Sequence, residues 1–127
     1  MAPLDDKALR LLEEPSFGFL AVDDGGPHVS PLWVDTDGTH VLVNTAVGRV
    51  KERAMTEGAP VAISVSPPGN PYEHVDIRGR VARRVEGEEA DEHIRALGRK
   101  YHGPDYAFTI REGERRVKIW IEPTVVA

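Results

Sequence analysis

The sequence contains no cysteine, few aromatic residues and no long apolar run. Without cysteine there is no disulfide framework, zinc-thiolate site or thiol nucleophile, which fits a reducing cytoplasm. No segment approaches the ~20 apolar residues of a membrane-spanning helix. The acidic start MAPLDDKALRLLEE also lacks the apolar core of a signal peptide. We therefore expect a cytoplasmic protein that does not enter a membrane.

Excess basic charge and metal-ligand motifs are missing too. The formal net charge of −5 disfavours general nucleic-acid binding. The histidines show none of the spacings HxH, HxxxH or HExxH, so no metal site is predicted. What is present, 127 residues of which 40% are hydrophobic, suffices for one domain over residues 1–127.

Hydrophobic periodicity predicts short strands with three interspersed helices. The DDGG and DTDG tetrads are typical of hairpin turns, because Asp and Gly tolerate positive φ. Helices are expected over residues 5–14, 47–57 and 86–100. Asp5 or Asp6 can cap the first, whose apolar face is Ala8, Leu11 and Leu12, and the third has Ala90, Ile94, Leu97 and Tyr101 on one face. Strands are expected over 17–22, 28–34, 40–43, 60–66, 74–85 and 115–126, and the last two show alternating apolar residues. We expect the first three strands to form a meander and PVAISVS to be buried on both faces. The predicted fold is mainly β, a six-stranded antiparallel barrel with short helices.

The stretch NTAVGRVKERA, residues 44–54, carries three cations on alternate residues. On a helix Arg49 and Arg53 are neighbours, whereas Lys51 points elsewhere. Arg49 and Lys51 converge only if a ligand sits at the helix N-terminus, where free N–H groups favour an anion and Thr45 adds a hydroxyl. Two interpretations stay open here: an anion site, or an ordinary basic helix start. Arg53 is expected to be a bystander.

Other polar and aromatic residues point less clearly to chemistry. His28 and Ser30 share one face of a predicted strand, where a structural role is the more common one. Trp33 and Trp120 lie on predicted strands, with core packing as the default role. The basic residues after position 77 either pair with the acidic helix that starts near Glu86 or border a second anionic group.

Three segments carry a family resemblance: FGFLAVDDGGPHVSPLWVDTDG, VLVNTAVGRVKERAM and NPYEHVDIRGRV, of which the second is the most specific. They resemble the pyridoxamine-phosphate-oxidase-like split β-barrel family, in its branch that uses the deazaflavin coenzyme F420. The resemblance covers roughly residues 9–124. One departure is Ala54, where the branch usually has Asn, so a hydrogen bond that this Asn makes is absent.

The resemblance implies a homodimer of split barrels with cofactor sites at the dimer interface. It places Arg49 and Lys51, with Gly48, at the coenzyme phosphate, and Asn44 and Thr45 near the ring or ribityl chain. The segment containing Ser30, Pro31 and Trp33 would line the ring. The remaining implied contacts are the backbone of Ala62, Ile63 and Ser64 and, from the second subunit, Lys118 and Trp120.

The activity implied by the resemblance is hydride transfer from reduced F420 to an unsaturated small molecule. His28, Ser30 or a water are the candidate proton donors. Two other functions remain open: an FMN-dependent oxidase or reductase of the same fold, and a non-catalytic F420-binding carrier.

Overall fold

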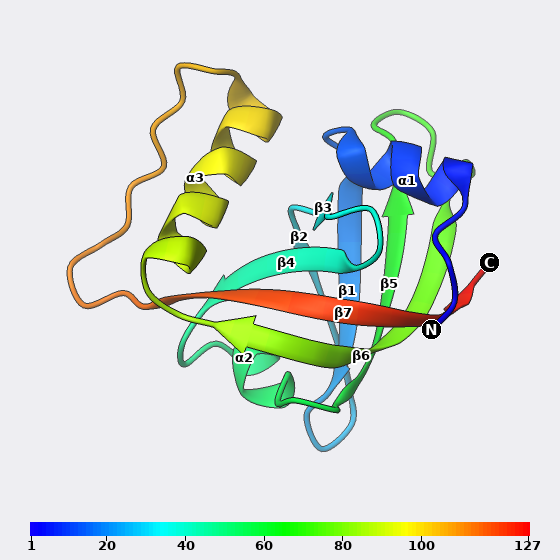
Figure 1. The fold of residues 1–127 in the computed structure, drawn as a ribbon, viewed down its shortest axis with the longest axis horizontal. Coiled ribbons are helices and arrows are strands. Elements are labelled where there is room, and N and C mark those ends of the chain that lie inside the picture. The colour runs from blue at the N-terminus through cyan, green and yellow to red at the C-terminus, as the bar shows by residue number, and fades with distance from the viewer.

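The computed structural model describes all residues 1–127 as a curled antiparallel sheet, a half-barrel, with three helices (Figure 1). The helices are α1 (Asp6–Glu13), α2 (Val50–Ala54) and α3 (Glu88–His102). The strands are β1 (Phe17–Asp23), β2 (Pro27–Leu32), β3 (Asp35–Thr36), β4 (Val41–Ala46), β5 (Pro60–Ser66), β6 (Val75–Val85) and β7 (Arg116–Val126). Their order in the sheet is β2-β1-β5-β6-β7-β4-β3. No helix combines the length and the apolar character needed to cross a membrane.

All of the predicted strands are present, but the predicted meander is wrong. β1 and β2 form a hairpin, whereas β4 pairs with β7, so that Leu42 lies opposite Trp120 and Asn44 opposite Lys118. A seventh strand, the two-residue β3, pairs with the start of β4. β4 is buried at every position. A strand of this kind needs cover on both faces, and it finds this cover between the barrel core and α3.

β5 is buried on one face only, contrary to the prediction. Val61, Ile63 and Val65 point into the core, while Ala62 and Ser64 lie half-buried on the outer face. Small side chains are compatible with either environment, so the apolar composition of PVAISVS did not discriminate between them.

The sheet curls where the long strands β6 and β7 shift register. One shift lies between Arg78 and Gly79, and there the two backbones approach very closely. A Cβ at Gly79 would lie 2.4 Å from the carbonyl oxygen of Glu122. A residue without a side chain is therefore required at this bulge, and bulges bend strands.

One end of the half-barrel is covered by α1. Its first N–H groups are capped by Asp5, whose carboxylate accepts a bond of 2.8 Å from the backbone N–H of Ala8. Ala8, Leu11 and Leu12 are fully buried against the barrel core, which confirms the predicted helix and its buried face.

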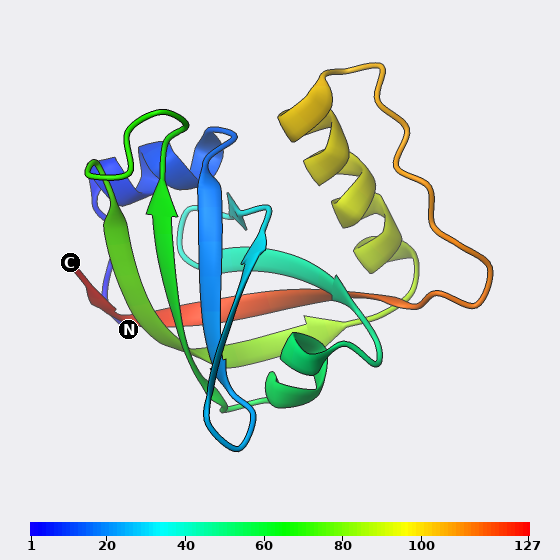
Figure 2. The same ribbon diagram turned by 180° about the vertical axis from the view of Figure 1, so that it is seen from behind.

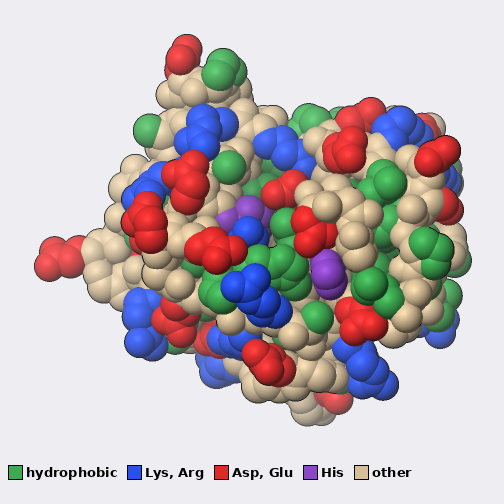
Figure 3. Space-filling model, in the orientation of Figure 1, with side chains coloured by type: hydrophobic (Ala, Val, Ile, Leu, Met, Phe, Trp, Pro, Cys, Tyr) green, Lys and Arg blue, Asp and Glu red, His purple; other side chains and the backbone are tan.

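The third helix lies outside the half-barrel, against β4 and β7, and the chain then returns through residues 103–115 to β7 (Figures 1 and 2). Ala90, Ile94 and Leu97 are buried on its inner face, as predicted. The acidic first turn of α3 forms ion pairs with basic residues of the sheet. The carboxylate of Glu89 lies 3.9 Å from the guanidinium of Arg83 and 3.3 Å from the ammonium of Lys118. On the face shown in Figure 3, acidic and basic side chains are interspersed in this way.

Candidate functional site

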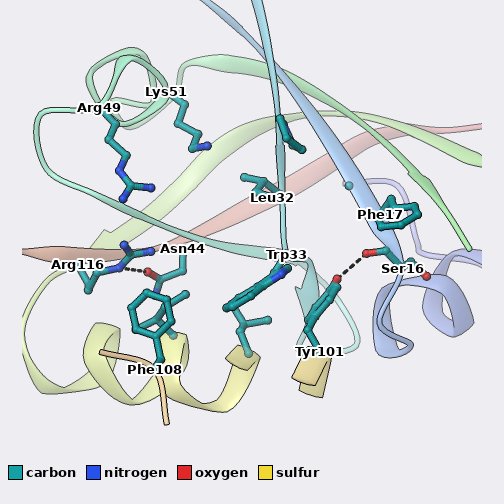
Figure 4. Close-up of a pocket in the computed structure, with 14 residues that line it drawn as sticks. Ser16, Phe17, Leu32, Trp33, Asn44, Arg49, Lys51, Tyr101, Phe108 and Arg116 are labelled. Atoms are coloured by element: carbon teal, nitrogen blue, oxygen red, sulfur yellow. Dashed lines mark hydrogen bonds between the residues drawn. The ribbon is translucent and has the colours of Figure 1, made fainter. Parts of the chain in front are cut away.

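A cavity of about 420 Å³ lies between α3, the segment after it and the outer side of the sheet (Figure 4). Its two ends differ in character. Arg49, Lys51 and Arg116, called the cationic cluster below, line one end, and the other end is apolar and aromatic. The volume lies within the ~300–1,000 Å³ typical of small-molecule sites.

The cationic cluster has little acidic compensation. Arg49 makes no ion pair, and the Nζ of Lys51 has one hydrogen-bond acceptor, the Oγ of Ser30 at 3.3 Å. Only Arg116 has a carboxylate partner, Glu114 at 3.2 Å. Burial, followed by repulsion from Arg49 and Arg116, lowers the pKa of Lys51. Burial also lowers the pKa of Arg116. Cations held together at this energetic cost make this end of the cavity a candidate site for an anion.

The nearest acid on α2 does not neutralise the cluster, because other groups occupy its carboxylate. Glu52 is buried, pairs with Arg84 at 2.7 Å and accepts a hydrogen bond of 2.9 Å from the backbone N–H of Gly48. The bond from Arg84 is the main reason that the pKa of Glu52 is lowered. Its charge is therefore directed away from the cavity.

The helix that carries the predicted anion site is shorter than predicted. The helix over residues 47–57 shrinks to the five-residue α2, which begins at Val50. Glu52 takes the N–H of Gly48, and the N–H of Arg49 bonds to the carbonyl of Ala46 at 3.3 Å. The N–H groups of Gly48 and Arg49 are therefore occupied within the turn, and the side chains of Arg49 and Lys51 line the cavity. Arg53 lies exposed outside the cavity, and its Nη1 donates to the carbonyl of Gly48 at 2.6 Å.

Stacked rings form the other end of the cavity. Trp33 and Tyr101 stack with centroids 5.3 Å apart, and Phe108 meets Trp33 edge-on at 6.1 Å. The hydroxyl of Tyr101 donates to the carbonyl of Ser16 at 2.7 Å and accepts from the N–H of Val34 at 2.9 Å. Burial raises the pKa of Tyr101 to about 12. This wall is rigid and suits a flat, apolar ligand surface.

The structure brings together part of the predicted site. Pro31, Trp33, Asn44, Arg49 and Lys51 line the cavity, and Ser30 contacts Lys51 at its edge.

Other predicted residues lie elsewhere in the isolated chain. Thr45 alternates with Asn44 along β4, so it faces the core, where its hydroxyl has no partner. The other predicted site residues outside the cavity lining are Gly48 on an exposed turn, His28 on β2, Ala62, Ile63 and Ser64 on β5, and Lys118 and Trp120 on β7. The Nζ of Lys118 lies over the ring of Trp120, 4.5 Å from its centroid.

The sequence analysis missed Arg116, Tyr101 and Phe108 as cavity residues. In the sequence, nothing distinguishes Arg116 from the other basic residues after position 77. It reaches the cavity because β7 pairs with β4, which places it opposite Ala46. Tyr101 was predicted on the inner face of a helix, but no local signal indicated that this face would border a cavity.

A curled antiparallel sheet with short helices and a cavity against its outer side places the chain in the split β-barrel class. The chain belongs to the pyridoxamine 5'-phosphate oxidase family, whose model matches residues 4–127. No curated protein matches.

Solved structures show the same fold. One, named F420 reductase, is 31% identical, with a TM-score of 0.76 over 93% of this chain and 94% of that one. A putative pyridoxamine 5'-phosphate oxidase from Listeria innocua is 19% identical, with a TM-score of 0.68 over 96% and 94% of the two chains. An FAD binding protein from Mycobacterium smegmatis is also 19% identical, with a TM-score of 0.61 over 98% and 94%.

Proposed function

We propose that this protein is an F420-dependent oxidoreductase that reduces an unsaturated small molecule. The observation that carries the proposal is the cationic cluster at one end of an aromatic cavity, which fits a phosphate attached to a flat ring system. The similarity to a structure named F420 reductase favours the deazaflavin over other cofactors of this type.

Each end of the cavity would have its own task. Arg49, Lys51 and Arg116 would bind the phosphate, and the stacked pair Trp33 and Tyr101 would orient the ring and exclude water from it. The reduced deazaflavin supplies a hydride when bound. The protein's contribution is orientation, electrostatics and a place for the substrate.

Ser30 is the better placed of the two candidate proton donors. Its Oγ accepts from Lys51, which leaves its own proton free to be donated toward the cavity side of β2. Neither Ser30 nor His28, two residues earlier on the same strand, lines the cavity itself, but only Ser30 contacts a residue that does, Lys51. A water remains the third candidate for this step.

A second copy of the chain would complete the site. Phe17, Phe19 and Val29, called the apolar patch below, are 54%, 46% and 65% exposed on the outer face of β1 and β2. Exposed apolar surface of this kind favours association. Ala62 and Ser64 lie on the same face, since they are paired with Ala21 and Phe19. Docking of a second copy there would bring the predicted β5 residues to the cofactor site, while the expected contribution of Lys118 and Trp120 stays a prediction.

Cofactor titration tests this function. The purified apo-protein is titrated with F420 and, under the same conditions, with FMN. Tighter binding of F420 is expected, and tighter binding of FMN would overturn the choice of cofactor. Reduced F420 is then offered with a panel of enones, quinones, nitroaromatics and biliverdin-like compounds. Tight binding without reduction of any of them would favour a carrier.

A matched pair of variants localises the site. Arg49→Ala should weaken F420 binding, whereas Arg53→Ala, four residues further on, should leave it nearly unchanged, because both arginines are exposed but only Arg49 lines the cavity. Equal losses at both positions would indicate a diffuse basic surface instead of a defined phosphate site.

A further inference from the structure

A chain of hydrogen bonds runs from the cationic cluster into the protein, behind the cavity. The Nε of Arg116 donates to the Oδ1 of Asn44 at 3.0 Å, a bond visible in Figure 4. The Nδ2 of Asn44 lies 3.2 Å from the Nδ1 of His93, and the Nε2 of His93 lies 3.1 Å from the Oδ2 of Asp35. Arg116, Asn44 and His93 are 4%, 6% and 7% exposed, so water does not satisfy these groups instead.

The chemistry of the two ends permits one arrangement of protons. The amide of Asn44 is held from both sides: Arg116 can only donate, and the carbonyl of Ala90, 2.9 Å from Nδ2, can only accept. The Oδ1 of Asn44 therefore faces Arg116, and its NH2 group faces His93. The Nδ1 of His93 must then accept, so its Nε2 carries the proton and donates it to the carboxylate of Asp35.

We propose that His93 is a positioning residue for the anion site. Its Nδ1 holds the amide of Asn44 in the orientation that presents Oδ1 to Arg116, and Asp35 selects the ring tautomer. The guanidinium of Arg116 is thereby held at Nε, which leaves its Nη2 edge for an anion in the cavity, since Nη1 pairs with Glu114. This rests on the proposed anion site, and it extends that site to two residues outside the cavity, His93 and Asp35.

The arrangement explains why a polar histidine is buried on the inner face of α3. Its neighbours Ile94 and Leu97 bury apolar area there, and a leucine at position 93 would do the same. A leucine would leave the NH2 group of Asn44 and the carboxylate of Asp35 each with one partner fewer. The amide would then be held by Ala90 and Arg116 without the third contact, and it would turn more easily.

Two substitutions separate positioning from packing. In His93→Asn, the Oδ1 of the new side chain occupies the place of the ring Nδ1 and can accept from Asn44, but this shorter side chain does not reach Asp35. His93→Gln extends to the place of Nε2 and can donate to Asp35, but it offers Asn44 no acceptor. Each variant loses ring volume and one hydrogen bond, so a merely structural role predicts similar behaviour of both.

Inorganic sulfate is the probe, because it keeps its charge over the working pH range and does not involve F420. Sulfate is titrated into the full-length protein while the Nε–H signal of Arg116 is followed by NMR. We expect His93→Asn to bind sulfate within about twofold of wild type, and His93→Gln to bind it about three- to tenfold more weakly, the effect of one lost hydrogen bond. His40→Gln, on a histidine paired with Asp37 away from the cavity, is the control and should behave as wild type.

The ring nitrogen shifts of His93 give an independent readout. The wild-type spectrum should show the proton on Nε2, and a proton on Nδ1 would overturn the proposal. Equal weakening in His93→Asn and His93→Gln, or no saturable sulfate binding by wild type, would overturn it as well. Failure of F420 to bind, together with the expected split between the two variants, would reject the proposed function and leave the positioning role intact.

Discussion

Removal of Lys51 should weaken coenzyme binding without a loss of stability. In the free protein its ammonium group is partly buried and lies beside Arg49 and Arg116, and both conditions disfavour its charge. Lys51→Ala relieves this repulsion and breaks one hydrogen bond, the 3.3 Å contact with Ser30. We expect the free energy of unfolding of the apo-protein to stay constant or to rise by up to about 1 kcal/mol, the range of partly exposed charge pairs.

The same substitution should weaken coenzyme binding. A charge-assisted hydrogen bond to a phosphate contributes about 1.5–3 kcal/mol, so the dissociation constant for F420 should rise about 10- to 150-fold. Fluorescence titration with F420 measures the affinity, and urea denaturation of the apo-protein measures the stability. Substitution of a residue that stabilises the fold lowers both the affinity and the free energy of unfolding. Substitution of a residue that serves only the ligand lowers the affinity alone.

Arg53→Ala is the internal control for this experiment. Arg53 is exposed, and its guanidinium donates to the carbonyl of Gly48 in the turn before α2. Its removal should cost up to about 1 kcal/mol of stability and should change the affinity for F420 little. Marked destabilisation by Lys51→Ala, or equal loss of affinity in both variants, would refute the reasoning.

Three further predictions follow from the same geometry. Because the pKa of Lys51 is lowered in the free protein and a bound anion favours its charged form, affinity for F420 should fall as the pH rises through that lowered pKa, with proton uptake on binding; calorimetry in buffers of different ionisation enthalpy measures this uptake. Phe19→Asp should convert a dimer into a monomer by light scattering, since Phe19 belongs to the apolar patch; a wild-type protein that is already monomeric would contradict this. Tyr101→Phe leaves the N–H of Val34 and the carbonyl of Ser16 without the hydroxyl, and urea denaturation should show a loss of about 1–3 kcal/mol; a loss below about 0.5 kcal/mol would show that water replaces the hydroxyl.

Local patterns were sufficient to locate most elements of the fold. The cap at Asp5 or Asp6, the alternation in β6, and the helical spacing of Ala90, Ile94 and Leu97 depend on neighbours in sequence; the structure confirms the spacing and the alternation and assigns the cap to Asp5. The order of the strands does not depend on neighbours. The expected meander failed because β4 pairs with β7, 70 to 80 residues away, and burial of both faces of β4 governs that choice.

For the candidate site the division is similar. The stretch NTAVGRVKERA determined by itself that Asn44, Arg49 and Lys51 stand close together, because they are few residues apart in the chain. Only the tertiary structure decided that Arg116 joins them at the cavity, that the helix after them is one short turn, and that Tyr101 closes the far end of the cavity. The physical reason is that these contacts join β4 to β7 and to α3, and such pairings are selected by burial across the whole domain and not by the residues on either side.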